Sequence, residues 1–276
     1  MTSTTIATIP GASRPGFTNA LVSELTKLRS VRSTYIQALL TVVLGIGMTA
    51  LIALAIGSTW DEVSVEERAT FDPVNVSSFG SIFALIVLVV LGVMFVSSEY
   101  TSGMIRLTLT TTPRRLRVLA AKSLIIIAVV LVLGVIVSVG SFYAGQAVLG
   151  SYEGVPTASL SDEGAVRSVV GVWLLMPVFP LLGAAAAFVL RSTASTITAI
   201  LGLIFVPAIF GGIFPDSIQE NVIKFLPSFA IDSVTTTDPG GDSLTRLNEG
   251  AALAVIAAWL FVFFFAAYVS LMRRDV

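Results

Sequence analysis

The segment "SSEYTSGMIRLTLTTTPRRLRVLAAKS", residues 97–123, joins two long apolar stretches. The apolar run before it stops at Glu99, a Thr-rich segment follows, and three arginines and one lysine fall within residues 114–122. Charges are rare elsewhere, since 12% of the 276 residues are Asp, Glu, Lys or Arg while 55% are hydrophobic. A soluble domain of this length needs a far more polar surface. The composition therefore indicates a membrane protein with several spans.

Two residue types that carry much of catalytic chemistry are absent from the sequence. It has no cysteine, which excludes disulfides, thiolate metal sites and thiol catalysis. It has no histidine, which excludes the usual proton shuttle, metal ligand and catalytic base. The net charge of −1 gives no indication of nucleic-acid binding. We therefore expect no catalytic site, no directly bound metal or cofactor, and no nucleic-acid partner.

Six stretches without Asp, Glu, Lys or Arg are long enough to cross a bilayer. At 1.5 Å per residue, about 20 helical residues cover the roughly 30 Å hydrocarbon core. Helices are favoured over a barrel, because a barrel needs alternating segments of about ten residues. The expected fold is an all-α polytopic membrane protein with one six-span transmembrane domain over residues 35–276. The expected spans are about 35–57, 79–98, 113–149, 168–190, 192–214 and 250–272.

Basic residues fall mostly on one side of this topology. With six spans, the N-terminus, the 97–122 loop, the turn at Arg191 and the C-terminus share a side. The opposite side holds only Arg68, Arg167, Lys224 and Arg246, together with most of the acidic residues. By the positive-inside rule, both termini are expected in the cytoplasm. The expected location is the bacterial cytoplasmic (inner) membrane, with multiple passes.

Two segments precede the first span. Residues 1–15 are rich in Thr, Ser, Pro and Gly and are expected to be disordered. Residues 16–34 place Phe17, Leu21, Leu25 and Leu28 at helical spacing, with basic residues on other faces. This pattern predicts an amphipathic interfacial helix on an anionic lipid surface. The alternative is that these basic residues serve only to set topology.

The loop between the second and third spans has signals of internal order. Thr112 followed by Pro113 is a typical helix start, with a capping residue and proline at the first helical position. The third helix is therefore expected to begin at Pro113 and to run to about Leu149, well beyond bilayer thickness. Residues 99–112 leave room for a short helix and a turn with an apolar edge. An ordinary positive-inside loop is the alternative that the residues alone leave open.

This region resembles the type-2 ABC export permeases, the membrane subunits of ATP-driven exporters. The resemblance rests on Glu99, Gly103, "LTLTTTP" at 107–113, Arg115 and Lys122 in that order. Met104 departs from the pattern, since Thr is usual after the glycine. The resemblance implies a type-2 ABC exporter-like fold.

Two further segments resemble the same family. "SELTKLRSVRS" at 23–33 is similar to its elbow helix, with Glu24, Lys27 and Arg29 in the acidic-then-basic pattern. "KFLPSFAIDSV" at 224–234 is similar to its external segment, with Leu226 and Pro227 at the recurring Leu-Pro. The six-span hydropathy profile matches over nearly the whole chain.

The resemblance implies that residues 100–110 contain a coupling helix that docks into a cleft on a cytoplasmic ABC ATP-binding subunit. It also implies that Glu99 lies at the membrane boundary, in a polar contact that links the helices there. The chain has no G-x-x-x-x-G-K-[ST] motif, so ATP and Mg would be bound by the partner ATPase subunit. Six spans are half of the family's usual complement, which implies a second permease as a homodimer or related heterodimer. The residues assigned to ATPase coupling are Glu99, Tyr100, Gly103, Met104, Ile105, Arg106, Leu107, Pro113, Arg114 and Arg115.

The apolar interior gives two further indications. Four aromatic residues are candidates for a hydrophobic substrate route, although such residues more often face lipid or neighbouring helices. The six stretches contain no ionisable residue, whereas ion-coupled carriers usually place one at mid-membrane. This argues against a secondary transporter and against an intramembrane hydrolase. The four aromatic residues are Phe83, Phe205, Phe210 and Phe214.

The leading hypothesis is a permease subunit of an ATP-driven exporter, bound to membrane lipid, without catalytic activity of its own. Its expected cargo is amphipathic, such as a drug in multidrug export, a peptide antibiotic or a lipid-like molecule. One alternative is a non-transport membrane scaffold or sensor that docks a cytoplasmic partner through its 97–122 loop. Another is an energy-independent channel, which calls for a polar pore-lining stripe that the sequence does not show.

Overall fold

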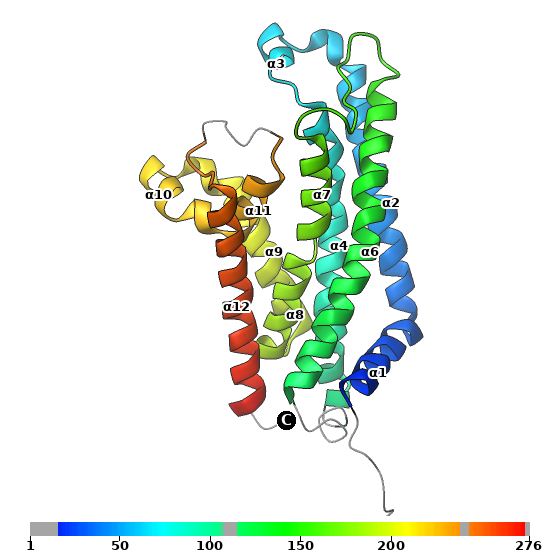
Figure 1. Ribbon diagram of the computed structural model, residues 1–276, viewed down its shortest axis with the longest axis vertical. Coiled ribbons are helices and arrows are strands. Elements are labelled where there is room, and N and C mark those ends of the chain that lie inside the picture. The colour runs from blue at the N-terminus through cyan, green and yellow to red at the C-terminus, as the bar shows by residue number, and fades with distance from the viewer. Residues whose placement is uncertain (1–15, 106, 108–114, 238–242, 274–276) are drawn as a thin grey trace, which may run out of the picture.

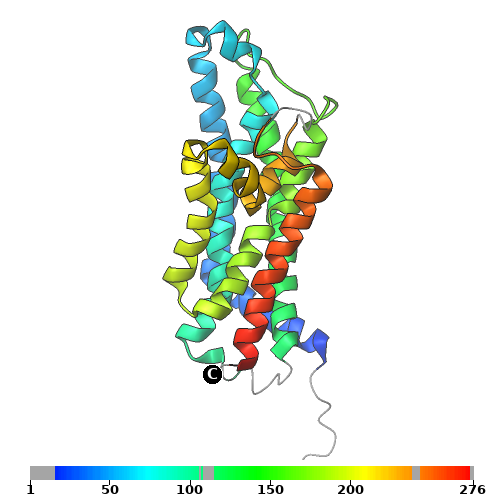
Figure 2. The same ribbon diagram turned by 90° about the vertical axis from the view of Figure 1, so that its left-hand side faces the viewer.

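The computed structural model describes residues 16–105, 107, 115–237 and 243–273, and no β-strand occurs among them. Long helices run up and down along one axis and form a bundle (Figure 1). The turned view shows the same upright arrangement, with the C-terminal helix α12 in front of the bundle (Figure 2). The described helices are α1 (Phe17–Ser30), α2 (Arg32–Ser58), α3 (Val65–Ala69), α4 (Pro73–Thr101), α6 (Arg115–Leu149), α7 (Ala165–Leu175), α8 (Val178–Leu190), α9 (Thr193–Phe210), α10 (Asp216–Asn221), α11 (Pro227–Thr235) and α12 (Glu249–Arg273). Three short 3₁₀ turns lie at Trp60–Glu62, Gly211–Ile213 and Ile223–Phe225.

Six segments are long and apolar enough to cross a membrane. The expected all-α fold with six spans is therefore confirmed. The segments are Arg32–Ser58, Pro73–Thr101, Arg115–Leu149, Ala165–Leu190, Thr193–Ile213 and Glu249–Arg273.

The bundle has two ends that differ in their connections (Figure 1). We call the lower end in Figure 1 the basal end; it carries α1, the end of α4, the described start of α6, the α8–α9 turn and the end of α12. The upper end is the apical end; it carries α3, α10, α11 and the connection between α6 and α7. Glu99 and Lys122, two of the residues that carry the resemblance to the export permeases, therefore belong to the basal end.

The N-terminal amphipathic helix is shorter than the expected 16–34. The helix α1 ends at Ser30, because Val31 adopts an extended backbone with φ −94° and ψ 119°. Helix α2 then begins at Arg32, so this residue opens the first span. The expected disordered tail, residues 1–15, lies outside the described residues.

The third and fourth spans also differ in detail from the expectation. The described part of α6 begins at Arg115, and the expected start at Pro113 lies outside the described residues. The fourth span is two helices, α7 and α8, that meet at Met176 and Pro177. Because proline has no backbone N–H and its ring crowds the preceding turn, a break at Pro177 is the physical consequence of its position.

Helix α4 is central to the packing, since α2, α6, α8 and α9 all contact it. The α2–α4 crossing is close because it uses glycine on both helices. A Cβ placed on Gly80 would come within 2.0 Å of the Gly45 carbonyl oxygen and 2.1 Å of the Thr49 hydroxyl. Small residues allow membrane helices to approach this closely. The crossing sets the position of α4, and with it the position of Glu99 at its basal end.

Candidate functional site at the basal end

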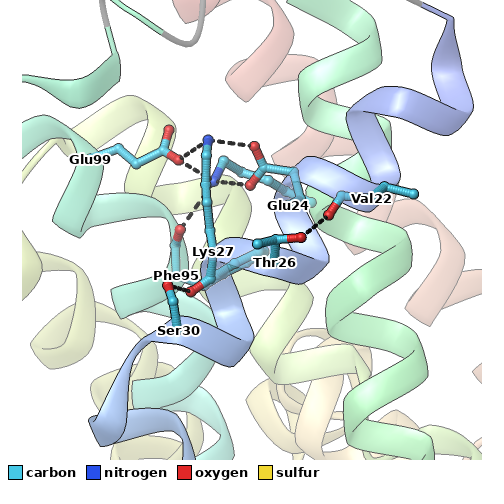
Figure 3. Close-up of polar contacts among 8 residues, drawn as sticks. Val22, Glu24, Thr26, Lys27, Ser30, Phe95 and Glu99 are labelled. Atoms are coloured by element: carbon cyan, nitrogen blue, oxygen red, sulfur yellow. Dashed lines mark hydrogen bonds and ion pairs between the residues drawn. The ribbon is translucent and has the colours of Figure 1, made fainter.

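Four charged residues form a buried cluster at the basal end, and we call Glu24, Lys27, Glu99 and Lys122 the charge cluster. The Lys27 ammonium lies 2.7 Å from Glu24 Oε1 and 2.8 Å from Glu99 Oε1. The Lys122 ammonium lies 2.7 Å from Glu24 Oε2 and 2.9 Å from Glu99 Oε1. Each ammonium therefore bridges both carboxylates, and Figure 3 shows the Lys27 nitrogen between Glu24 and Glu99. The cluster ties together α1, α4 and α6.

The burial of the charge cluster is uneven. Lys122 is 1% exposed and Glu24 is 3% exposed, whereas 32% of the Lys27 side chain is accessible. Lys122 also donates a hydrogen bond to the Phe95 carbonyl oxygen at 3.3 Å, and its ammonium lies 4.4 Å from the centre of the Phe95 ring. A buried ammonium is stable only when its hydrogen bonds and its charge are satisfied. The two carboxylates and the Phe95 carbonyl meet both conditions for Lys122.

The sequence folds so that these four side chains converge. In α1, the buried residues Ala20, Glu24 and Leu28 recur every fourth position and form one helix face. In α6, Lys122 shares a stripe of the same spacing with the buried residues Val118 and Ile126. Two buried faces thus carry one charge each into the contact between α1 and α6.

The pKa of Lys27 depends on both carboxylates of the charge cluster. Burial lowers the pKa of Lys27, but the hydrogen bonds to Glu24 and Glu99 and their negative charges together outweigh burial. The pKa of Lys27 therefore lies above its ordinary value of 10.5. Lys27 is therefore charged at neutral pH.

The charge cluster adjoins the segment that the sequence assigned to ATPase coupling. Helix α4 ends at Thr101, and Gly103 follows with φ +72°, a left-handed conformation that glycine adopts without strain. The chain is helical again at Met104, Ile105 and Leu107. Ile105 is 3% exposed and anchors this segment, while Met104 and Leu107 are 46% and 58% exposed. The segment thus presents two apolar side chains outward from a buried base.

Tyr100 and Arg115 connect this region to the C-terminal half of the bundle. The Tyr100 ring packs edge-on against Phe188 of α8, with ring centres 6.3 Å apart. Arg115 Nη1 donates a hydrogen bond to the Leu271 carbonyl oxygen of α12. Tyr100 is therefore held by α8, and Arg115 is held by α12. Arg106, Pro113 and Arg114, also assigned to coupling, lie outside the described residues.

A groove of about 280 Å³ runs beside the charge cluster between α1, α2 and α4. Its lining includes Lys27, Gln37, Phe95, Ser98 and Met104. The accessible part of Lys27 faces this groove, which explains why Lys27 is less buried than Lys122. The groove therefore extends from the charge cluster to the exposed Met104.

The four aromatic residues proposed for a substrate route lie elsewhere. Phe83 and Phe205 are partly buried, and Phe205 packs against the main apolar core. Phe210 and Phe214 are 49% and 46% exposed, at the apical end of α9 and just after it. None of the four lines the groove beside the charge cluster. A common substrate route through them stays a prediction.

The burial of Lys122 was not predicted from the sequence. Lys122 lies inside the expected 113–149 span, one position before the charge-free stretch that begins at Ser123, and the structure buries it in α6. The signal was the spacing of Val118, Lys122 and Ile126, which places the lysine on the buried stripe. Glu24 was noted only as part of a sequence pattern, and its pairing with Lys122 comes from the structure.

Six apolar helices in one bundle, with an amphipathic helix anchored at one end by buried charges, define a polytopic membrane protein. The family model described as ABC-2 family transporter protein matches residues 19–276, and the chain belongs to this family. The expected resemblance is therefore confirmed. The protein is therefore a transport permease, a membrane component of an ABC transporter. Permeases of this family generally have no catalytic site of their own, and membership of the family implies an ABC ATP-binding partner. No curated protein matches the chain.

Proposed function

We propose that the chain is the membrane subunit of an ATP-driven exporter in the bacterial cytoplasmic membrane. A separate ABC ATP-binding subunit hydrolyses ATP with Mg and docks at the basal end, which faces the cytoplasm. A second permease, identical or related, completes the membrane unit. The cargo is amphipathic, such as a drug, a peptide antibiotic or a lipid-like molecule.

The observation that carries this proposal is the position of Glu99 between Lys27 and Lys122. Its carboxylate oxygen lies 2.8 Å from one ammonium and 2.9 Å from the other. Glu99 occupies the last turn of α4, directly before the segment with the exposed Met104 and Leu107. A displacement of that segment would act on α1, α4 and α6 together, because the charge cluster joins them. Helices that are linked and move as one rigid body can transmit such a displacement from the cytoplasmic surface into the membrane.

The exposed apolar pair supports docking of a protein at this position. Met104 and Leu107 project from a segment whose Ile105 is buried. Apolar side chains that leave water on association contribute strongly to protein interfaces. Arg106 lies between them in sequence and adds a positive charge to the segment.

The distribution of charge supports the orientation. Among the described residues, the basal end has many more basic than acidic side chains, as the positive-inside rule requires of a cytoplasmic face. The acidic residues there are Glu24 and Glu99, and the basic residues are Lys27, Arg29, Arg32, Arg115, Arg117, Lys122, Arg191 and Arg273.

The proposal is tested by co-expressing the chain with its ABC ATP-binding subunit and measuring complex formation and ATP hydrolysis. Met104→Glu and Leu107→Glu are expected to leave the permease folded and to weaken the complex at least about tenfold, since each places a charge in an apolar contact. Val65→Glu is the matched control, because Val65 is an apolar residue with 79% exposure at the apical end. Deletion of residues 100–110 or Arg106→Glu is expected to uncouple hydrolysis from transport. Unchanged binding and export in these variants would contradict the proposal.

The orientation has its own test, because the chain has no cysteine and single cysteines can be introduced without a background. Val65→Cys at the apical end is expected to react with a membrane-impermeant maleimide added to intact cells. Ser23→Cys, exposed on α1 at the basal end, is expected to react only after the membrane is opened. The reverse labelling would place the basal end outside the cell and overturn the assigned orientation.

A further inference from the structure

The turn between α8 and α9 places an arginine in an unusual conformation at the basal end. Arg191 has φ 55°, and it is the only residue other than glycine with positive φ in the described part of the chain. Its backbone N–H bonds the Ala187 carbonyl oxygen at 3.0 Å and ends α8. The guanidinium carbon lies 5.3 Å from the centre of the Tyr100 ring. A left-handed arginine is uncommon, and the side chain of this one lies over the Tyr100 ring.

The polar atoms at this contact are buried and unsatisfied. Arg191 Nε and Nη2 are buried and have no hydrogen-bond partner among the described residues. The Tyr100 hydroxyl, also buried, has none within the same part of the chain. The aromatic ring attracts the guanidinium through its face but accepts none of these hydrogen bonds in their ordinary geometry. Buried donors without acceptors are costly, so an acceptor from outside the described residues is needed here.

The charge around the contact favours a negative acceptor. Within residues 16–105, 107, 115–237 and 243–273, the two carboxylates at the basal end belong to Glu24 and Glu99, and both are already bridged by lysines. Arg191, Glu99 and Arg115 all lie close enough to Tyr100 to act on it electrostatically, so two positive charges and one negative charge surround this side chain. Local positive charge thus exceeds the negative charge that the described residues supply.

The position of the pair identifies the source of the acceptor. Tyr100 follows Glu99 of the charge cluster and precedes the docking residues Met104 and Leu107. Thr193 of α9 donates a hydrogen bond of 2.8 Å to the Ser97 hydroxyl of α4, which holds the α8–α9 turn beside the end of α4. The Arg191–Tyr100 contact therefore adjoins the surface on which the ATP-binding subunit is expected to dock.

We propose that Arg191 and Tyr100 form a carboxylate-binding site for an Asp or Glu side chain of the ABC ATP-binding subunit; this rests on the proposed function. A guanidinium presents paired N–H donors in a plane that matches the two oxygens of a carboxylate. The Tyr100 hydroxyl supplies a further donor. The site adds a specific polar contact to the apolar contact made by Met104 and Leu107.

The test measures the Tm of the isolated permease and its affinity for the ATP-binding subunit, because the proposal predicts that a variant without the donors keeps its Tm and loses affinity. Arg191→Met keeps the length of the side chain and the left-handed backbone but removes the unpaired donors. The Tm of the isolated permease is expected to stay constant or to rise by roughly 1–5 °C. Affinity for the ATP-binding subunit is expected to fall about tenfold or more. Tyr100→Phe removes only the hydroxyl. We expect the Tm of the isolated permease to stay constant or to rise, and affinity for the ATP-binding subunit to fall about threefold.

Arg29→Met is the matched control, since Arg29 is an exposed arginine at the same end of the molecule. It is expected to change neither quantity. A fall in the Tm of the isolated Arg191→Met permease would show that this chain itself satisfies the guanidinium, and it would overturn the proposal. Unchanged affinity of Arg191→Met for the ATP-binding subunit would overturn the proposal as well. So would a variant that binds this subunit normally and has lost only the rise in Tm that added phosphatidylglycerol gives the wild type. If the wild-type permease binds no ABC subunit, the proposed function itself fails, which is a separate result.

Discussion

Lys122 of α6 and Glu99 of α4 form a buried ion pair, with 2.9 Å between Nζ and Oε1, at the point where α4 leaves the bundle. Both residues also contact α1, Lys122 through Glu24 and Glu99 through Lys27. An ion pair of this kind gives limited net stability, because desolvation of two charges offsets much of their attraction. Removal of only one of its two charged side chains is nevertheless costly, because the other charge stays buried. The contacts of the pair join α1, α4 and α6. We therefore assign it the role of linking them.

The first prediction concerns the buried lysine. Lys122→Met leaves Glu24 and Glu99 with only Lys27 as a cationic partner in the cluster. Removal of one member of a buried ion pair typically costs about 3–5 kcal/mol, so we expect a large drop in the Tm of the purified permease. Lys27→Met is expected to cost much less, since about a third of that side chain is accessible to solvent. Equal losses in the two variants would show that burial does not set the energetics of the cluster.

The second prediction concerns alkaline pH. The pKa of Lys27 is raised in the folded protein because the two carboxylates outweigh burial. A raised pKa gives stability that is fully present below the ordinary value of 10.5 and is lost as the pH rises through the folded value. Lys27→Arg keeps its charge throughout this range. We expect the Tm of the wild type to fall more steeply above pH 10.5 than that of Lys27→Arg; parallel curves would contradict the role of Lys27.

The third prediction concerns the α2–α4 crossing. Gly80→Ala would bring a methyl group within 2.0 Å of the Gly45 carbonyl oxygen, so the two backbones have to separate. Overpacking of this kind typically costs about 1–3 kcal/mol, which thermal unfolding of the purified permease would detect. Gly47→Ala is the matched control, because a Cβ at Gly47 meets no atom within 4 Å. A neutral Gly80→Ala variant would mean that the helices cross less closely than described.

Much of the fold is predictable from the sequence because lipid makes the burial rule simple. Charge-free stretches mark the spans, and Asp72 with Pro73 marks the true start of α4, where the aspartate side chain accepts hydrogen bonds from Val74 and Asn75 N–H. The helix thus begins at Pro73, before the expected start of the second span at residue 79. Local signals of this kind identify helix ends before the packing is known.

The candidate site was less predictable because its side chains come from three helices. The apolar stripe of α1 predicted a helix that lies on a lipid surface, and Phe17 and Leu25 are exposed in the structure. The face of α1 that is buried in the protein is a different one, formed by Ala20, Glu24 and Leu28. A carboxylate on a buried face is favourable only when a partner is present, and that partner, Lys122, lies 98 residues away. Sequence spacing shows which side of a helix a residue occupies, but not which residue of another helix it meets.

The most direct test of the account uses a neutral double variant, Glu99→Gln with Lys122→Met. It removes one charge of each sign and keeps the Glu24–Lys27 pair, so its Tm should exceed that of Lys122→Met alone. The docking residues Met104 and Leu107 are unchanged.

The measurement is the ATP hydrolysis rate of the ABC subunit with and without this permease, alongside the affinity of the two proteins. We predict that affinity stays within about threefold of the wild type while the effect of the permease on hydrolysis is largely lost, since α1, α4 and α6 no longer move as one. Hydrolysis that responds to the double variant as it does to the wild type would contradict the linking role of the charge cluster.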